Sequence, residues 1–312
     1  MAFNHRQKRA GSDDRKHPSA AWRWLCLALP LALAACHSAL LDPRGPVGRA
    51  EKTILLDSLA IMLSIVVPTI VATLAFAWWF RASNTRARYR PEWEFSGQIE
   101  LVVWSIPVMV IILLGGVTWI GSHQLDPAVP LSKDKPLDIQ VVSLDWKWLF
   151  IYPEQGIATV NQLTIPAGVP VRFSLTSASV LNAFFIPQLG SMIYTMNGMR
   201  TELNLRADAP GTYRGISSHY SGEGFSDMHF DVHAVAPGEF AAWVGSTHGA
   251  GARLDAAGYA ALARPSIKVP PASYGVVEAG LFERIVTQEI APSAGPEPGK
   301  AGSTQKAVEG TE

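Results

Sequence analysis

Cysteine is scarce in this sequence. The 312 residues include two cysteines, Cys26 and Cys36, and both lie near the amino terminus. If the segment before Cys36 is removed, the remaining chain has one cysteine. A single cysteine forms neither an intramolecular disulfide nor a site that needs two thiolate ligands. The rest of the chain must therefore fold without a disulfide.

Charge is also sparse. Only 17% of the residues are Asp, Glu, Lys or Arg, 48% are hydrophobic, and the formal net charge is zero. A neutral chain has no basic footprint for nucleic acid, so we expect no nucleic-acid partner. Much of the hydrophobic excess is concentrated in early blocks without charge, which is typical of membrane sequence rather than of an unusually large core.

Two uncharged runs, residues 59–80 and 101–120, are long enough to cross a bilayer as helices. We expect a transmembrane hairpin within residues 36–122, with spans at about 57–80 and 100–120. The connecting loop, residues 81–98, carries four arginines. Short arginine-rich loops stay in the cytoplasm, so both ends of the hairpin are expected outside.

Residues 1–35 have the pattern of a signal peptide, with a basic start, a short apolar run and small residues at the end. The ending Leu33-Ala34-Ala35-Cys36 resembles the bacterial lipobox, in which the cysteine becomes the lipid-bearing first residue. We expect cleavage before Cys36 and its lipidation, with palmitate among the acyl groups. The alternative is an uncleaved amino-terminal anchor. The lipobox predicts a lipoprotein and the hairpin predicts two spans. Together they predict a multi-pass lipoprotein of the bacterial inner membrane, with both mature termini in the periplasm.

Beyond the hairpin the hydrophobic period changes to two. Apolar and polar residues alternate over residues 137–141, 169–175, 203–205 and 228–232, and turn signals separate these runs. Residues 123–236 are therefore predicted to form a β-sandwich or barrel. Residues 237–290 contain segments compatible with short helices, at 237–244, 255–263 and 276–290. Residues 291–312 lack periodicity and are rich in Pro, Gly, Ser and Lys, which predicts a disordered tail.

The glycine-rich loop from His219 to Asp231 resembles the copper loop of subunit II of haem-copper cytochrome c oxidases, Cys-Ser-Glu-x-Cys-Gly-x-x-His-x-x-Met, in register on Ser221. The six copper positions of that family fall here on Asn182, Tyr220, Gly222, Gly224, Met228 and Asp231. Copper sites of this type need thiolate and imidazole donors. The resemblance thus implies a cupredoxin-like domain at residues 123–236 without copper, and no cofactor in this chain.

Two further segments carry the same resemblance. Trp146-Lys147-Trp148 resembles the aromatic motif of oxidase subunit II, and here we expect it to serve in core and interface packing. Residues 237–290 resemble the aromatic-rich extension of quinol-oxidising members. With the lipobox and hairpin, residues 25–290 resemble subunit II of cytochrome bo-type ubiquinol oxidases.

That resemblance implies a non-redox subunit of a proton-pumping quinol oxidase, which reduces oxygen to water in aerobic respiration. The subunit would support subunit I and contribute to proton entry. The implied partners are a subunit I that carries haem and copper, a subunit III, a small subunit IV, membrane lipid, and ubiquinol as the substrate of the complex. The alternatives are a membrane-anchored cupredoxin-like binding lipoprotein outside an oxidase, and a cytochrome c oxidase subunit II.

Glu100 lies at the cytoplasmic start of the second span. Ionisable groups at membrane depth are costly and mark proton routes, although a helix amino terminus also favours a carboxylate. The residue alone favours an interfacial carboxylate. Its position matches the subunit II glutamate that the resembling oxidases place at the mouth of a proton channel of subunit I, and with the resemblance we expect Glu100 to mark that entrance.

His229, Asp231 and His233 alternate along one predicted strand, with His219 nearby in sequence. Such a set could chelate zinc or copper. Side chains two residues apart on a strand are about 6 to 7 Å apart, too far to share an ion without a strong tilt. We therefore expect a solvated polar face opposite a core face.

Overall fold

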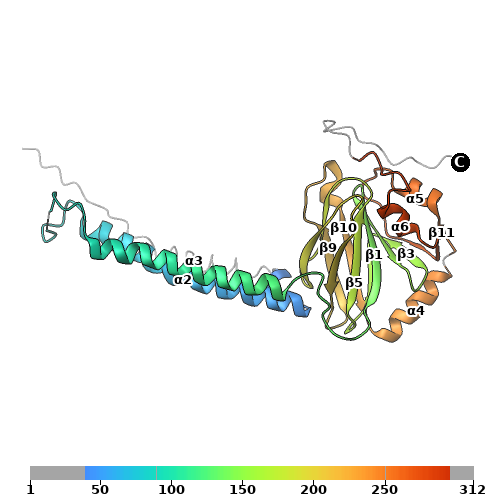
Figure 1. Ribbon diagram of the computed structural model, residues 1–312, viewed down its shortest axis with the longest axis horizontal. Coiled ribbons are helices and arrows are strands. Elements are labelled where there is room, and N and C mark those ends of the chain that lie inside the picture. Colours follow the sequence, from blue (N-terminus) through green and yellow to red (C-terminus); the bar gives the residue numbers. More distant parts are fainter. Residues whose placement is uncertain (1–38, 89, 250, 296–312) are drawn as a thin grey trace, which may run out of the picture. The chain divides into compact units, whose positions relative to one another are not determined.

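The computed structural model describes residues 39–88, 90–249 and 251–295. The expected signal peptide, the expected lipidation site Cys36 and residues 296–312 of the expected tail lie outside the described residues. The described chain has two long helices, then a β-sandwich, then a small carboxy-terminal extension (Figure 1). This order confirms the predicted fold class.

The two long helices form the predicted hairpin. They are α2 (Pro46–Trp79) and α3 (Gly97–Gln124), and a single turn, η1 (Ala39–Leu41), precedes them. Each long helix contains an 18-residue window with a mean hydropathy of 2.4, and none of either window is buried inside the protein. Apolar surface on that scale is stable in hydrocarbon, and a helix satisfies its own backbone hydrogen bonds there.

Both helices are longer than their apolar runs, and α2 is extended mostly at its outer end. Pro46 occupies the first turn, where a missing N–H costs nothing. The preceding segment and the first turns of α2 are bonded to the sandwich, because the amide of Arg44 donates to Gln188 O at 2.6 Å and that of Gly48 to Leu189 O at 3.1 Å. The first turn of α2 thus contacts the sandwich.

The sandwich consists of a six-stranded and a five-stranded sheet. The first has the order β12-β3-β2-β1-β5-β8 and the second the order β4-β10-β9-β6-β7. The strands of the first are β1 (Leu137–Leu144), β2 (Lys147–Tyr152), β3 (Ile157–Val160), β5 (Val171–Ser177), β8 (Thr201–Leu205) and β12 (Ala272–Tyr274). Those of the second are β4 (Gln162–Pro166), β6 (Asn182–Ile186), β7 (Gly190–Thr195), β9 (Gly211–Ser217) and β10 (His229–Val235). β1 and β5 pair in parallel, as do β4 and β10.

Aromatic side chains fill the centre of the sandwich. Phe184 of β6 and Phe230 of β10 stack with ring centroids 5.3 Å apart and an interplanar angle of 13°. Trp148 of β2 meets both rings edge-on, at 5.4 and 5.7 Å. All three side chains are almost fully buried. The second tryptophan of the Trp-Lys-Trp motif is thus a core residue, as we expected.

The carboxy-terminal extension covers the outer face of the six-stranded sheet. Its elements are α4 (Pro237–His248), β11 (Arg253–Leu254), α5 (Ala256–Leu262), β13 (Val276–Val277) and α6 (Leu281–Val286). Leu149 and Ile151 of β2 pack there against Leu254, Tyr259 and Phe282 in a second core cluster. β2 is consequently buried at every position.

The prediction of a helix over residues 276–290 was wrong for most of that range. Val276 and Val277 pair with β11, and the helix is limited to Leu281–Val286. The tail also begins later than expected, because the amide of Ser293 donates to Ala178 O at 2.9 Å. In both segments, backbone contacts with other parts of the chain override the local sequence pattern.

Candidate functional site

Two of the positions that match copper ligands, Asn182 and Met228, meet at one end of the five-stranded sheet. Asn182 begins β6, Ser217 ends β9, and Met228 directly precedes β10. Ser217 donates its hydroxyl to Asn182 Oδ1 at 3.4 Å and its amide to Met228 O at 3.0 Å. The exposed fractions of Asn182 and Met228 are 1% and 2%. The two positions that would carry imidazole ligands thus lie buried and linked through one serine.

The loop between β9 and β10 packs on Trp146. The indole nitrogen of Trp146 donates to Ser221 O at 3.0 Å, and Gly224 lies under its ring. A Cβ atom on Gly224 would lie 2.5 Å from two ring atoms of Trp146 and from Ile267 Cγ2. Trp146 fills the space that the first atom of a cysteine side chain would need. Its own φ of 63° is rare for a bulky residue.

The remaining copper positions do not converge with these. Tyr220 is 73% exposed and packs edge-on against Phe225 at 5.6 Å. Gly222 supplies a turn with a φ of 101°. Asp231 is exposed on β10, opposite Arg214 of β9. The six positions thus offer an amide, a phenol, a thioether and an outward carboxylate, a set that does not fit a thiolate-bridged copper centre.

The alternating histidines of β10 point outward, as predicted for a polar face. His229 and Asp231 are exposed and His233 is half-buried, whereas Phe230 and Val232 between them are buried. His233 Nδ1 lies 3.2 Å from the hydroxyl of Thr212. Within residues 39–295, leaving aside positions 89 and 250, no three His, Cys, Asp or Glu side chains are close enough to hold an ion.

Lys147, between the two tryptophans, is buried to 1% exposure. Its Nζ donates to Arg264 O and to Ser266 Oγ, both at 2.7 Å, and both partners belong to the extension. Burial lowers the pKa of Lys147 to about 8, and the charge of Asp145 opposes that shift. Asp145 is also buried and accepts from Ser293 Oγ at 2.9 Å.

Lys147 and Asp145 together bond the β1–β2 turn to the extension. The motif did not predict this role, because its resemblance rests on the two tryptophans and not on the lysine between them. A signal was present, since Lys147 is the only charged residue in an otherwise uncharged strand.

Glu100 occupies the first turn of α3, at the end opposite the sandwich. Its amide donates to Ser96 O at 3.0 Å, and its Oε2 accepts from Trp104 Nε1 at 3.0 Å. Both side chains are exposed on the helix surface. The part of α3 beyond Glu100 is about 36 Å long, so this carboxylate and the copper loop are separate sites.

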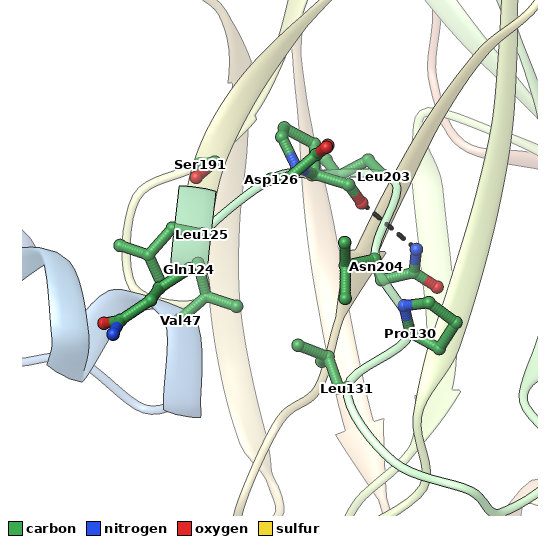
Figure 2. Close-up of a pocket in the computed structure, with 11 residues that line it drawn as sticks. Val47, Gln124, Leu125, Asp126, Pro130, Leu131, Ser191, Leu203 and Asn204 are labelled. Carbon is green, nitrogen blue, oxygen red and sulfur yellow. Dashed lines mark hydrogen bonds between the residues drawn. The ribbon is translucent and has the colours of Figure 1, made fainter. Parts of the chain in front are cut away.

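A cavity of about 180 Å³ lies where the outer ends of the helices meet the sandwich (Figure 2). Its lining is largely apolar and includes Val47, Leu125 and Leu203. Asn204 faces it, but Nδ2 is already bonded to Pro127 O at 3.1 Å. The carboxylate of Asp126 accepts from the amide of Ala128 at 3.0 Å. The polar groups of Asn204 and Asp126 are thus already bonded within the junction between the hairpin and the sandwich.

Comparison with known families agrees with this architecture. Residues 137–235 match the family described as cytochrome c oxidase subunit II, periplasmic domain, and residues 249–292 match the aromatic-rich motif of the same oxidases. Cytochrome bo(3) ubiquinol oxidase subunit 2 of Pseudomonas aeruginosa is 50% identical over 275 residues, which cover 88% of this chain and 83% of that protein. The chain belongs to the family of quinol oxidase subunit 2.

Other members of the family are similar over comparable lengths. Ubiquinol oxidase subunit 2 of Acetobacter aceti is 51% identical, covering 84% of this chain and 86% of that protein. Quinol oxidase subunit 2 of Bacillus cereus is 37% identical, covering 78% and 85%. This subunit 2 is thus a membrane-anchored component of a multi-subunit terminal oxidase. Family membership supports that interpretation over both alternatives, a binding lipoprotein and a cytochrome c oxidase subunit.

Proposed function

We propose that this subunit carries no redox centre and serves a ubiquinol oxidase that reduces oxygen to water and pumps protons. The observation that carries the proposal is the copper loop, which keeps its place between β9 and β10 while all six ligand positions hold other residues. The names of the relatives support ubiquinol as the substrate of the complex. Electrons then enter subunit I directly, at its haem and copper, without passing through this chain.

The chain's own contribution is structural on the outer side. The hydrogen bonds of Arg44 and Gly48 to the segment before β7 fix the sandwich to the hairpin, so the domain is held over the outer surface of subunit I. Subunit III and a small subunit IV complete the proposed complex. We also propose that Cys36 carries lipid, which places the mature amino terminus and the sandwich in the periplasm of a bacterial inner membrane.

On the cytoplasmic side we assign Glu100 to proton entry. Its carboxylate lies in the first turn of α3, where the apolar span begins, and no basic side chain pairs with it among the described residues. A carboxylate there takes a proton from cytoplasmic water and gives it to a channel of subunit I. The carboxylate of Glu100 returns to its ionised form after each transfer.

Substitution of Glu100 tests that role in the intact complex. Glu100→Ala should lower steady-state ubiquinol oxidation by about tenfold while assembly, haem content and initial haem reduction stay normal. Glu100→Asp should retain more activity than Glu100→Gln, because it keeps an ionisable group. The measurement is oxygen consumption per haem, in complex isolated through a tag on this chain.

Glu94→Gln is the matched control, since it changes an exposed carboxylate in the preceding loop. It should leave turnover unchanged. Wild-type turnover in Glu100→Ala, at normal haem content, would make Glu100 an ordinary interfacial carboxylate. A parallel loss of haem and activity would also reject the proton role.

A further inference from the structure

Glu100 has one side-chain partner among the described residues, the indole of Trp104. The Nε1–H group of Trp104 donates to Oε2 of Glu100 at 3.0 Å. The two residues are four apart on α3, so their side chains lie on the same face, one turn from each other. No other hydrogen bond in the described part of the chain reaches the Glu100 carboxylate or the Trp104 indole.

The direction of the helix explains why this partner matters. Side chains on a helix lean towards its amino terminus, which for α3 is the cytoplasmic end. A lone glutamate in the first turn therefore extends away from the membrane and into water. Trp104 leans the same way from one turn deeper, and its N–H group meets the carboxylate. The hydrogen bond keeps the carboxylate close to the apolar part of the helix.

We propose that Trp104 is a positioning residue for proton entry, and this inference rests on the proposed function of Glu100. The indole fixes Oε2 and leaves Oε1 free to take a proton from water and to release it to subunit I. The indole N–H keeps its own proton throughout. A tryptophan N–H that faces hydrocarbon also needs an acceptor, so the bond is favourable for both groups.

The competing explanation is that Trp104 only helps to fix α3 at the membrane interface, where tryptophan is common. Trp119 provides the matched comparison on the same helix. It is 68% exposed, against 69% for Trp104, and its ring lies 4.3 Å from that of His123. Within residues 39–295, except 89 and 250, the Trp119 indole nitrogen donates no hydrogen bond.

Three single variants separate the two explanations in the isolated complex. Trp104→Phe keeps an aromatic ring without the N–H group and should lower kcat for ubiquinol by about threefold to tenfold, with KM and haem content unchanged. Trp119→Phe should leave kcat at the wild-type value. Trp104→Gln keeps an N–H donor without the ring and should retain more activity than Trp104→Phe. Interface fixation alone predicts the opposite order, with Phe better than Gln.

A double variant gives the decisive result. If Trp104 acts through Glu100, then Trp104→Phe should cause no further loss of kcat in a Glu100→Ala background. Equal fractional losses in both backgrounds would overturn the positioning role, as would a Trp104→Phe enzyme that matches Trp119→Phe. Wild-type turnover in Glu100→Ala alone would instead reject the proposed proton role of Glu100, so the two failures are distinguishable.

Discussion

The contact between Trp146 and Gly224 shows that the copper loop differs from a metal site in packing as well as in donors. The indole donates to Ser221 O and lies where a side chain at position 224 would begin. A glycine at 224 is what permits that approach. Restoring a cysteine there requires the indole or the loop to move, in addition to the five other donor substitutions.

Gly224→Ala tests this packing with the smallest possible change. The added methyl group should overpack the contact with Trp146 and Ile267 and destabilise the protein by about 1–3 kcal/mol. Gly238→Ala in α4 is the control, because nothing lies within 4 Å of a Cβ atom at that position. The measurement is the thermal midpoint of the purified chain in detergent. Equal midpoints for the two variants would show that the loop is free of the indole.

At single residues, the sequence indicates a role only where a stretch resembles a family motif. The six copper positions and the proton role expected of Glu100 come from that resemblance, and the role of Glu100 stays a prediction. No motif indicates three of the side-chain hydrogen bonds, those of Trp146 to Ser221, Lys147 to Arg264 and Trp104 to Glu100. The first two join residues far apart in the chain. The third joins residues four apart on a helix, and such a spacing is too common to indicate a particular contact.

At the scale of elements, β1 and β2 show why alternation predicts some strands and misses others. The expected run at residues 137–141 lies within β1, whose first residues alternate between buried and half-buried. β2 is buried at all six positions, because the sandwich core lies on one face and the extension on the other. A strand covered on both faces has no period of two, and the layer that covers it is encoded more than a hundred residues later.

Lys147 couples β2 to that layer, and its burial gives a test by pH. Its pKa is lowered from 10.5 to about 8, so between these values the unfolded chain binds more protons than the folded one. This residue therefore makes the free energy of unfolding rise with pH across that window. We expect the thermal midpoint of the wild type, minus that of Lys147→Met, to rise between pH 8 and about 10.

The difference should be flat below pH 8, where the lysine is protonated in both states. Lys133→Met is the control for general effects of pH, because Lys133 is exposed. A wild-type minus Lys147→Met difference that stays constant from pH 7 to about 10 would mean that the buried ammonium is not confined between the sandwich and the extension.

For the molecule as a whole, the two candidate sites lie at opposite ends of α3. At the outer end, the amides of Arg44 and Gly48 bond the hairpin to the sandwich. In the sandwich, the ring of Trp146 occupies the space beside Gly224 in the loop between β9 and β10. At the amino-terminal end of α3, the carboxylate of Glu100 accepts a hydrogen bond from Trp104. In the proposed function neither site carries electrons. The order of hairpin, sandwich and extension was predictable from hydrophobic patterns and the resemblance. The contacts that join these parts were not, because they link residues far apart in the sequence.

A comparison of electron donors distinguishes a quinol oxidase subunit from a subunit that receives electrons from cytochrome c. The complex is isolated through a tag on this chain, and oxygen consumption is measured with ubiquinol or with reduced cytochrome c as the only donor. If the chain is a copper-free subunit of a quinol oxidase, ubiquinol supports turnover and cytochrome c does not. Turnover with cytochrome c, together with about two copper ions bound per copy of this chain, would contradict the account.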